Sequence, residues 1–497
     1  MIDNRMGDSG MEDNWIQDNR MEDNGMKDKE DYLSTLNERQ LDAVTTTEGY
    51  VRIIAGAGTG KTKALTHRYA YLVNELGIST SNILCVTFTN KAAREMSKRI
   101  RQMIGDSDTG YICTFHGFCV KLLREDIHAI NFPQNFVVMD DEDTEEILKT
   151  VYENAHIQSR TYTFDSARDH ITAMKSQMLH IPYLAEIGNE KLLADYEKAE
   201  KVEDKVFLGY LYEQKKVYGL DYDDLITIAL YILQTDETKQ IKWQERMMYV
   251  MVDEFQDVSN SQYALAEILS GYHRNLFIVG DPDQTIYTWR GAQIEYILEF
   301  DETHENTRTI FLDMNYRSTP EILTVSNSLI EKNKKRLPHR LEAYKESGRR
   351  PIYIHSKTTG DEAQWMTSEI QRLVSEGASY NEMAVLYRSH FVSRNIEESF
   401  IKVKIPYTLY SGVEFYKRKE IKDVLAYLRM IVYSDDLSFC RVINEPKRNF
   451  GKKRMALVKA YAESHRCSLY NGLLDILEDK TIKKAGAAAF VDTIEAF

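Results

Sequence analysis

One short stretch, AGAGTGKT at residues 55–62, constrains the fold more than any other feature of this chain. It follows the apolar run VRIIA (51–55) and opens a helical pattern, which is the strand–loop–helix context of a phosphate-binding loop. Glycines in such a loop let successive backbone N–H groups converge on phosphate oxygens. The stretch therefore predicts a P-loop at the end of a buried strand.

The positions of this loop have separate expected roles. The Lys61 ammonium would reach the β- and γ-phosphates, and the Thr62 hydroxyl would bind Mg²⁺. Ala55 stands where the strict pattern has its first glycine, whereas the later glycines keep the loop flexible. A plain strand–turn–helix with an incidental Gly-Lys-Thr is the structural alternative. The residues expected to bind the nucleotide here are Ala55, Gly56, Ala57, Gly58, Thr59, Gly60, Lys61 and Thr62.

A second pattern, VMVDEFQD at 250–257, places two carboxylates at the end of another hydrophobic run. In nucleotide hydrolases an aspartate at the position of Asp253 holds Mg²⁺, and the adjacent Glu254 polarises the attacking water. Acidic residues also cap strands without any catalytic role, so this motif is weak by itself. Beside the phosphate loop it favours a nucleotide-hydrolysing site.

Alternation of short apolar runs with helical patterns sets the fold class. The runs are turn-bounded, as buried parallel strands are, and NKAAREMSKRI (90–100) between them has helical spacing. We therefore predict an α/β fold of the nucleotide-binding kind. Residues 120–245 are mostly helical in pattern and would form an inserted domain. The runs are VRIIA (51–55), ILCVTF (83–88), MYVMVD (248–253) and NLFIVGD (275–281).

A second α/β block is expected further along the chain, followed by helices. Its strands would be TIFLD (309–313), PIYIH (351–355) and MAVLY (383–387), and the chain turns helical beyond Glu420. Two of the later patterns are amphipathic. The apolar positions are Ile421, Val424, Leu425 and Leu428 in the first and Phe490, Ile494 and Phe497 in the second.

Composition limits the setting of the protein. Net charge is −14, but bulk charge does not exclude nucleic acid, because phosphate contacts depend on local clusters of cations. Five scattered cysteines predict a reduced, cytoplasmic protein, and no apolar run reaches the roughly 20 residues that a membrane span needs. Residues 1–31 repeat with a period of five and predict a disordered acidic tail.

Further motifs, taken in order, resemble those of the UvrD-like superfamily 1 DNA helicases. The resemblance runs from about Tyr32 to the C-terminus. It implies a P-loop NTPase with RecA-like parallel-sheet motor domains, each interrupted by a helical insertion. The motifs are LNERQLDAV (36–44), TFTNKAAREM (87–96), TFHGFCVKLLR (114–124), LDYDDLI (220–226), VDEFQD (252–257), GDPDQTIYTWRGA (280–292), LDMNYRS (312–318), VLYRSHFVSRNIEESF (385–400), IPY (405–407) and FYKRKEIKDVLAYLR (415–429).

Several nucleotide contacts are implied by this resemblance. Gln40 would bond the adenine edge, Tyr316 would stack on the adenine, and Gln284 would touch the γ-phosphate. Arg317 would project onto the γ-phosphate, although an arginine after a tyrosine is more often a surface ion-pair partner. Arg68 would approach the nucleotide, with an exposed helix arginine as the alternative.

The resemblance also implies a track for DNA bases. Tyr287, Trp289 and Arg290 would face the DNA, Phe88 would stack on a base, and Thr89, Asn90 and Lys91 would meet the backbone. His116 would join them, or be a helix-start histidine without DNA contact. A helix cap at Asn90 is the competing interpretation. Base–aromatic stacking is worth about 1–3 kcal/mol per base and tolerates any sequence.

The activity implied is that of an ATP-dependent helicase moving 3′ to 5′ on single-stranded DNA, with ATP and Mg²⁺, in DNA repair or replication. Its DNA partners would be single strands and 3′-tailed duplexes. The expected parts are a first motor domain (32–119 and 246–305), its insertion (120–245), a second motor domain begun at 306–420, and a second insertion begun at 421–497.

Two family motifs, resembling TVHxxKGLE and YVxxTRA, do not occur in this sequence. The expectation is an incomplete second motor domain, with slow turnover unless a partner or second chain supplies these motifs. Two alternatives stay open. The chain is a non-catalytic ATP- or DNA-binding module or one half of a split helicase, or it is the helicase portion of an ATP-dependent exonuclease subunit.

Overall fold

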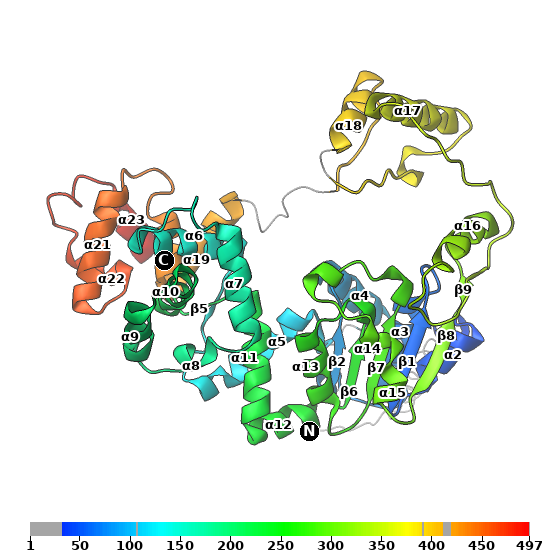
Figure 1. The fold of residues 1–497 in the computed structure, drawn as a ribbon, viewed down its shortest axis with the longest axis horizontal. Coiled ribbons are helices and arrows are strands. Elements are labelled where there is room, and N and C mark those ends of the chain that lie inside the picture. The colour runs from blue at the N-terminus through cyan, green and yellow to red at the C-terminus, as the bar shows by residue number, and fades with distance from the viewer. Residues whose placement is uncertain (1–31, 106–107, 390–391, 411–418, 497) are drawn as a thin grey trace, which may run out of the picture. The chain divides into compact units, whose positions relative to one another are not determined.

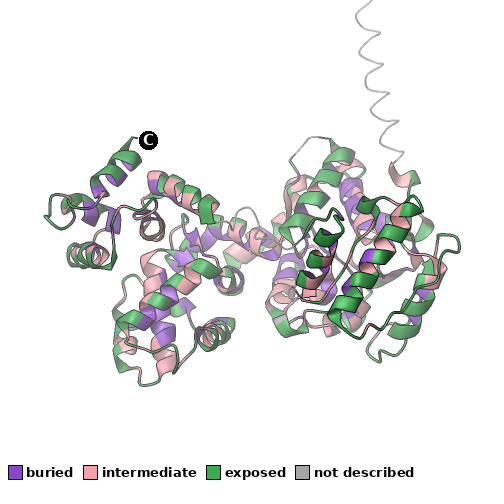
Figure 2. Cartoon of the chain, turned by 90° about the horizontal axis from the view of Figure 1, so that it is seen from above, coloured by how far each residue is buried: buried purple, intermediate pink, exposed green. Residues whose placement is uncertain are grey.

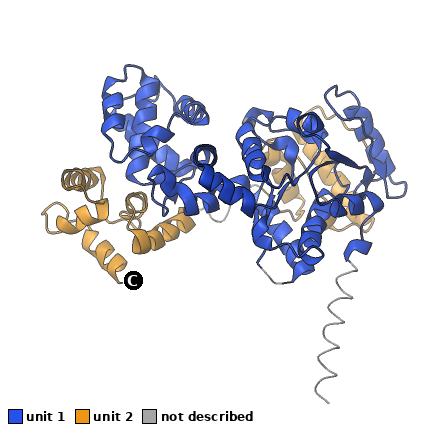
Figure 3. Cartoon of the chain, turned by 90° about the horizontal axis from the view of Figure 1, so that it is seen from below, with its two compact units in different colours: residues 1–350 blue, residues 351–497 orange. Residues whose placement is uncertain are grey.

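A computed structural model describes residues 32–105, 108–389, 392–410 and 419–496, so the expected acidic tail (1–31) lies outside the described residues. The chain divides into two compact units, residues 1–350 and 351–497 (Figure 3). Each unit has its own hydrophobic clusters. In the described part of the chain, no helix is long and apolar enough to cross a bilayer.

The first unit is built on a parallel sheet whose strands are short and buried. Among the described residues the strand order is β3-β2-β6-β7-β1-β8, and each neighbouring pair is parallel. The predicted α/β fold is therefore confirmed. The strands are β1 (Tyr50–Ala55), β2 (Ile83–Val86), β3 (Tyr111–Cys113), β6 (Tyr249–Val252), β7 (Leu276–Gly280) and β8 (Arg308–Leu312).

Helices cover both faces of this sheet because side chains alternate along each strand. Ile53 packs with buried residues of α2, α3 and α4. Its neighbour Ile54 belongs to the cluster formed with α13 and with two helices of the insertion, α5 (Phe115–Asp126) and α11 (Tyr222–Thr235). Figure 2 shows the buried residues gathered between these layers. The sheet-covering helices outside the insertion are α2 (Glu38–Thr45), α3 (Lys61–Asn74), α4 (Asn90–Ile104) and α13 (Asn260–Ser270).

Strand β8 corrects one expectation. The run at 309–313 was assigned to the second block, but β8 pairs in parallel with β1, with Ile53 opposite Ile310. Ile310 and Leu312 are buried in the same cluster as Ile53. Apolar periodicity identifies a strand but carries no information about its partner, so the assignment of this strand was wrong.

The predicted helical character of residues 120–245 is confirmed, apart from a two-residue ladder between β4 (Val137–Val138) and β5 (Gly219–Leu220). Figure 1 shows these helices grouped beside the sheet. They are α5 (Phe115–Asp126), α6 (Asp141–Asn154), α7 (Phe164–Ser176), α8 (Ile181–Leu184), α9 (Glu190–Lys198), α10 (Val202–Lys216), α11 (Tyr222–Thr235) and α12 (Glu237–Arg246).

A buried ionic cluster ties three of the insertion helices together. The Lys175 ammonium of α7 lies 2.5 Å from Asp221 and 2.7 Å from Asp224 at the start of α11. The Tyr210 hydroxyl of α10 donates to Asp221 at 2.7 Å. Burial and the Asp221 charge raise the pKa of Asp224 to about 8. The motif LDYDDLI therefore serves the packing of this domain.

The rest of the first unit leads from the sheet to residue 350. After β8 the chain forms β9, and β10 further along pairs in parallel with β9 in a separate two-stranded sheet. The elements are α14 (Glu295–Leu298), α15 (Phe300–Thr303), β9 (Met314–Asn315), α16 (Pro320–Ile330) and β10 (Glu342–Ala343).

The second unit lacks two strands that the sequence predicts. The runs at 351–355 and 383–387 have no ladder in the described residues, and Leu386 is 94% exposed. Val385 and Tyr387 pack on the cluster of α17 (Thr359–Ser375) and α18 (Ser393–Lys402). A strand exists only through a hydrogen-bonded neighbour, and the described residues offer these runs none.

The remaining helices of this unit form a separate cluster. In the last helix Phe490 and Ile494 are buried as predicted, and Phe497 lies outside the described residues. In the first, Ala426 and Met430 are buried instead of the predicted Val424, Leu425 and Leu428, which are exposed. The helices are α19 (Lys419–Tyr433), α20 (Asp436–Val442), α21 (Lys452–His465), α22 (Leu469–Asp475) and α23 (Ala487–Glu495).

Candidate nucleotide site and aromatic loop

The glycine loop joins β1 to α3, and its three glycines are each approached by a different element. A Cβ at Gly56 would lie 2.5 Å from Leu341, and one at Gly58 would lie 2.6 Å from the Arg317 Cβ. Gly60 has φ 92° and precedes the first residue of α3. The left-handed backbone at Gly58 and Gly60, and the Arg317 Cβ beside Gly58, favour glycine at these positions. The loop is therefore closely enclosed by the first unit.

Glu254, one of the two predicted acidic residues after β6, contacts the glycine loop directly. The Lys61 ammonium lies 3.1 Å from a Glu254 carboxylate oxygen, and the lysine side chain is only 12% exposed. Glu254 adopts a left-handed backbone with φ 49°, which is uncommon for a residue with a side chain. The turn after β6 thus aims this carboxylate at Lys61 of the glycine loop.

Asp253 has the surroundings of a metal ligand. Its side chain is buried, the Thr87 hydroxyl donates to Oδ2 at 3.2 Å, and Oδ1 has no hydrogen-bond partner in the described residues. Burial, with the nearby Glu254 charge, raises the pKa of Asp253 to about 6. A buried, unpartnered carboxylate oxygen that interacts electrostatically with Lys61 of the loop fits a hard cation such as Mg²⁺.

Gln256 links the Glu254 carboxylate to the loop at 280–291. Its amide nitrogen donates to Glu254 at 2.9 Å and to Asp257 at 3.3 Å, while its amide oxygen accepts the Asp281 N–H at 2.9 Å. The side chain is 2% exposed. Asp281 in turn accepts a hydrogen bond from the Gln284 side chain. A continuous polar chain therefore runs from Lys61 to the loop at 280–291.

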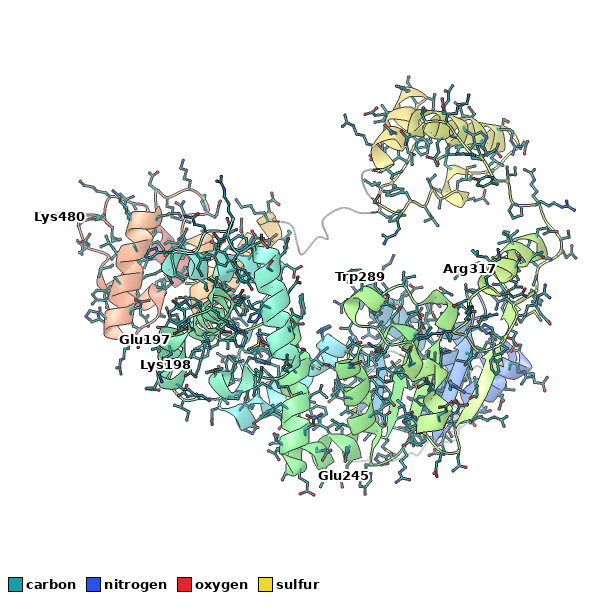
Figure 4. The ribbon with its side chains drawn as sticks, in the orientation of Figure 1. Glu197, Lys198, Glu245, Trp289, Arg317 and Lys480 are labelled. Atoms are coloured by element: carbon teal, nitrogen blue, oxygen red, sulfur yellow. The ribbon has the colours of Figure 1, made fainter. Side chains whose placement is uncertain are left out.

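The far end of that loop carries aromatic side chains. The Tyr287 ring stacks on Phe88 with centroids 4.8 Å apart and planes 26° apart, and Trp289 lies 6.3 Å from Tyr287. The Trp289 side chain is 70% exposed. Trp289 and Arg317 both lie along the upper edge of the α/β part in Figure 4. The structure thus brings Phe88, Tyr287 and Trp289 together, as the sequence predicts.

The residues after Phe88 begin α4. Thr89 is its N-cap and accepts the Ala92 N–H at 3.1 Å, so the competing interpretation of Asn90 as the cap is wrong. Asn90 and Lys91 are exposed in the first turn. The side chain of Arg290 lies outside the described residues, although its backbone closes the turn after Tyr287. These positions stay predictions as DNA contacts.

His116 lies in the first turn of α5, and its ring contacts Tyr222 edge-on at 5.5 Å. Burial lowers the pKa of His116, and the Asp223 charge opposes this. Tyr222 is 46% exposed and was not among the predicted site residues. Its place between Asp221 and Asp223 in the motif LDYDDLI was the available signal. The two interpretations of His116 remain open.

The motif LDMNYRS lies against the phosphate loop. The Asn315 amide donates to the Ala57 carbonyl and its oxygen accepts the Arg317 N–H at 2.9 Å, which fixes the turn. Tyr316 N–H donates to the Gly58 carbonyl at 2.9 Å. Arg317 is exposed and makes no ion pair with a described residue, so the alternative of a surface ion pair finds no support there. Asn315 is a positioning residue that the sequence did not reveal.

Gln40 lies at the same loop. Its amide donates to the Thr59 carbonyl at 2.9 Å, and it forms a capping box with Asn37. Asn37 also donates to the Tyr316 hydroxyl at 2.6 Å. The side chains expected to hold adenine thus occupy one edge of the loop, and their contact with a base remains a prediction.

Arg68 is the one nucleotide residue whose place disagrees with the prediction. Its guanidinium is buried, donates to the carbonyls of Ala43, Thr46 and Thr47, and lies over the Phe277 ring. Burial lowers its pKa. A buried charge needs hydrogen-bond partners, and these carbonyls supply them. Both the nucleotide contact and the alternative of an exposed arginine are therefore wrong.

A further group of ionisable side chains lies at the start of the loop at 280–291. Asp281, Asp283 and His339 lie within 4.8 Å of one another through their ligand atoms. Arg336, however, donates to both Asp283 oxygens at 3.1 and 2.8 Å. This bidentate pair neutralises Asp283 and fastens the loop to the segment after α16.

A glycine loop between a parallel strand and a helix, facing an acidic pair at the end of another strand, defines a P-loop NTPase. The model of the UvrD/REP helicase N-terminal domain matches residues 36–305, and that of the UvrD-like helicase C-terminal domain matches 310–497. The chain therefore belongs to the UvrD-like helicase family.

Curated relatives agree with this placement. The chain is 40% identical over 443 residues to an ATP-dependent DNA helicase PcrA of Staphylococcus aureus (strain Mu50 / ATCC 700699). The aligned residues cover 89% of this chain and 60% of that protein. The chain is 39% identical over 446 residues to the protein of the same name from Staphylococcus epidermidis (strain ATCC 12228 / FDA PCI 1200), with the same shares. The chain thus spans about three fifths of the length of these relatives.

Proposed function

We propose that this protein is an ATP-dependent DNA translocase and helicase that moves 3′ to 5′ on single-stranded DNA. One observation carries the proposal. A polar chain runs from Lys61 through Glu254, Gln256 and Asp281 into the loop whose Tyr287 stacks on Phe88. Phosphate chemistry and base contact therefore share one short segment.

The chain's own residues account for the hydrolytic step. Lys61 and the loop N–H groups hold the phosphates, which compete with Glu254 for the lysine ammonium. Glu254, released from Lys61, accepts the proton of the attacking water. Arg317, adjacent to Gly58, projects its guanidinium onto the γ-phosphate.

Asp253 and the Thr62 hydroxyl would hold Mg²⁺, which supplies charge neutralisation on the β- and γ-phosphate oxygens when bound. The unpartnered Asp253 oxygen supports this assignment. Gln284 reports the state of the γ-phosphate through its bond to Asp281. Gln40 and Tyr316 select adenine.

The release of Glu254 from Lys61 also changes how the aromatic loop contacts DNA. When Glu254 exchanges Lys61 for water, its bond to Gln256 changes, and Gln256 also holds the Asp281 N–H. Asp281 lies six residues before Tyr287, on a single loop. Bases stacked on Phe88, Tyr287 and Trp289 are therefore gripped differently in the two nucleotide states. Thr89, Asn90, Lys91, His116 and Arg290 would contact the strand beside them.

The printed names of the relatives, ATP-dependent DNA helicases, support this substrate class. The natural DNA would be a 3′-tailed duplex met in repair or replication, in the cytoplasm. The domain boundaries at 119, 245 and 420 remain part of the proposal, whereas the one at 305 does not, because β8 belongs to the first sheet.

Single-strand-stimulated ATP hydrolysis by the purified 497-residue chain tests the proposal. We expect oligothymidylate to raise the hydrolysis rate, and the nonhydrolysable analogue of ATP to change oligothymidylate affinity. A chain that binds both ligands without stimulated hydrolysis would be the binding module or split half. Nuclease activity dependent on ATP would favour the exonuclease-subunit alternative.

A further inference from the structure

Helix α4 (Asn90–Ile104) has an exposed basic face of which the proposed mechanism uses only Lys91, at its start. Its buried residues are Ala93, Met96 and Ile100, which pack on the sheet. The opposite face carries four cations at positions i, i+3, i+7 and i+10, which fall within about 80° of one another on a helix of 3.6 residues per turn. These are Lys91, Arg94, Lys98 and Arg101, all of them exposed, and we call them the α4 stripe.

The positive charges of the α4 stripe are not neutralised by described carboxylates. No described carboxylate forms an ion pair with any of its four members, whereas the neighbouring Arg99, on a different side of the helix, pairs with Glu95 at 2.5 Å. The nearest described acidic side chain in the following loop, Asp108, is engaged by the Gly110 N–H at 3.0 Å. On a chain of net charge −14, four unneutralised cations in a row are a local exception.

The surface beside the stripe is hollowed. An open hollow of about 480 Å³ on the surface of α4 is lined by Arg94, Ser97, Lys98, Arg101 and Gln102. The Ser97 hydroxyl lies 2.9 Å from the Thr109 hydroxyl, so the wall of this hollow carries further hydrogen-bonding groups. Cations and hydroxyls around an open hollow suit the oxygens of a phosphodiester backbone.

The stripe is continuous with the aromatic loop. Lys91 lies three residues after Phe88, whose ring stacks on Tyr287, and the helix leads away from that stack. The ten residue steps from Lys91 to Arg101 rise about 15 Å at 1.5 Å per residue. One strand of B-form DNA passes about four phosphates over that length, at 3.4 Å each.

We propose that the α4 stripe is a second DNA contact, a phosphate-binding track that holds the DNA backbone beyond the bases stacked at Phe88 and Trp289. This inference rests on the proposed function, because it takes DNA as the ligand of the aromatic loop. The track reads no sequence. It adds affinity that depends on salt and on DNA length.

The test compares a double variant, Lys98→Glu with Arg101→Glu, against the unaltered chain. Affinity is measured by fluorescence anisotropy for oligothymidylates of about 4 and about 16 nucleotides, which span known single-strand site sizes. For the longer strand, the slope of log affinity against log salt should fall in magnitude by about 1.4, as two lost contacts predict at 0.7 each. The shorter strand, held at the aromatic loop, should change little.

A matched control reverses two exposed lysines elsewhere, Lys198→Glu with Lys201→Glu, at the end of α9 and just before α10. It changes net charge equally, so an equal loss there would overturn the track in favour of general repulsion. An unchanged slope in the α4 variant would overturn it as well. Neutral Lys98→Ala with Arg101→Ala, checked by its melting temperature, guards against a folding defect.

Trp289→Ala separates this inference from the function on which it rests. If that variant loses affinity for both strand lengths while the α4 variant loses none, only the track fails. If Trp289→Ala leaves both affinities unchanged, the aromatic contact fails, and a slope change in the α4 variant would still show a backbone contact at α4.

Discussion

The two ends of the loop at 280–291 differ in almost every physical respect. At the phosphate end Gln256 and Asp281 are buried, and their hydrogen-bonding groups are paired with one another and with Glu254. At the other end Trp289 is 70% exposed beside the Phe88–Tyr287 stack. Chemistry on phosphate needs fixed polar groups, whereas contact with any base needs an accessible ring face. Substitutions should therefore affect one end and spare the other.

The largest effect is expected at the phosphate end, from Arg317→Ala. Loss of an arginine that stabilises charge on the transferring phosphoryl group costs about 10³–10⁵ in rate. Single-strand-stimulated hydrolysis should fall by that order, while oligothymidylate affinity without nucleotide stays the same. Arg160→Ala, at an exposed position of the insertion, is the control. Retained hydrolysis in Arg317→Ala would remove Arg317 from the site.

Glu254→Gln comes next. A missing general base typically costs about 10²–10⁴ in rate, and the amide can no longer pair with the Lys61 ammonium. Hydrolysis should be lost while ATP still binds, as followed with a fluorescent ATP analogue. Glu245→Gln, exposed on α12, should behave like the unaltered chain. A fully active Glu254→Gln would contradict the assigned proton acceptor.

Trp289→Ala probes the other end. Removal of one stacking platform should weaken oligothymidylate binding by about 1–3 kcal/mol, or roughly 5–150-fold. ATP affinity without DNA should not change. Trp289→Phe keeps an aromatic face and should restore most of the binding. Equal affinities of the alanine and tryptophan forms would exclude base stacking at this position.

The smallest effect, and the most informative, is expected between the two ends. Gln256→Leu removes all three hydrogen bonds of the bridging amide, and Gln256→Glu keeps an acceptor for the Asp281 N–H but loses the donor to Glu254 and Asp257. We expect the effect of nucleotide on oligothymidylate affinity to shrink by about 1 kcal/mol, roughly fivefold, in both variants. Direct titrations with and without nucleotide measure it. If nucleotide still shifts affinity fully, the coupling takes another route.

Much of the site was predictable because its residues are close in sequence and belong to patterns with a mechanism. The glycine loop and Lys61 required only a strand before and a helix after, and the structure has β1 and α3 there. Asp253 and Glu254 followed a buried strand in the same way. Phe88 and Tyr287 were each expected at the DNA track, although their stacking joins residues about 200 positions apart.

Other residues could not be placed from the sequence, because their roles depend on what lies around them. Arg68 looks like any helix arginine until the carbonyls of the 43–47 segment surround it. Gln256 acts only because Gly280 leaves room for its amide oxygen, 2.6 Å from where a Cβ would be. Asn315 is one amide among many until it meets the Ala57 carbonyl.

The sequence by itself determined the local motifs of this protein and its family: a glycine loop after a strand, an acidic pair after another strand, and aromatic side chains expected near them. Those features are local, since backbone conformation and side-chain type decide them within a few residues. The tertiary structure alone decided which strands pair and which side chains meet or become buried. It placed β8 beside β1, left 383–387 without a ladder in the described residues, and buried Arg68. Hydrogen bonds and burial join groups distant in the chain, and no local pattern records which groups will meet.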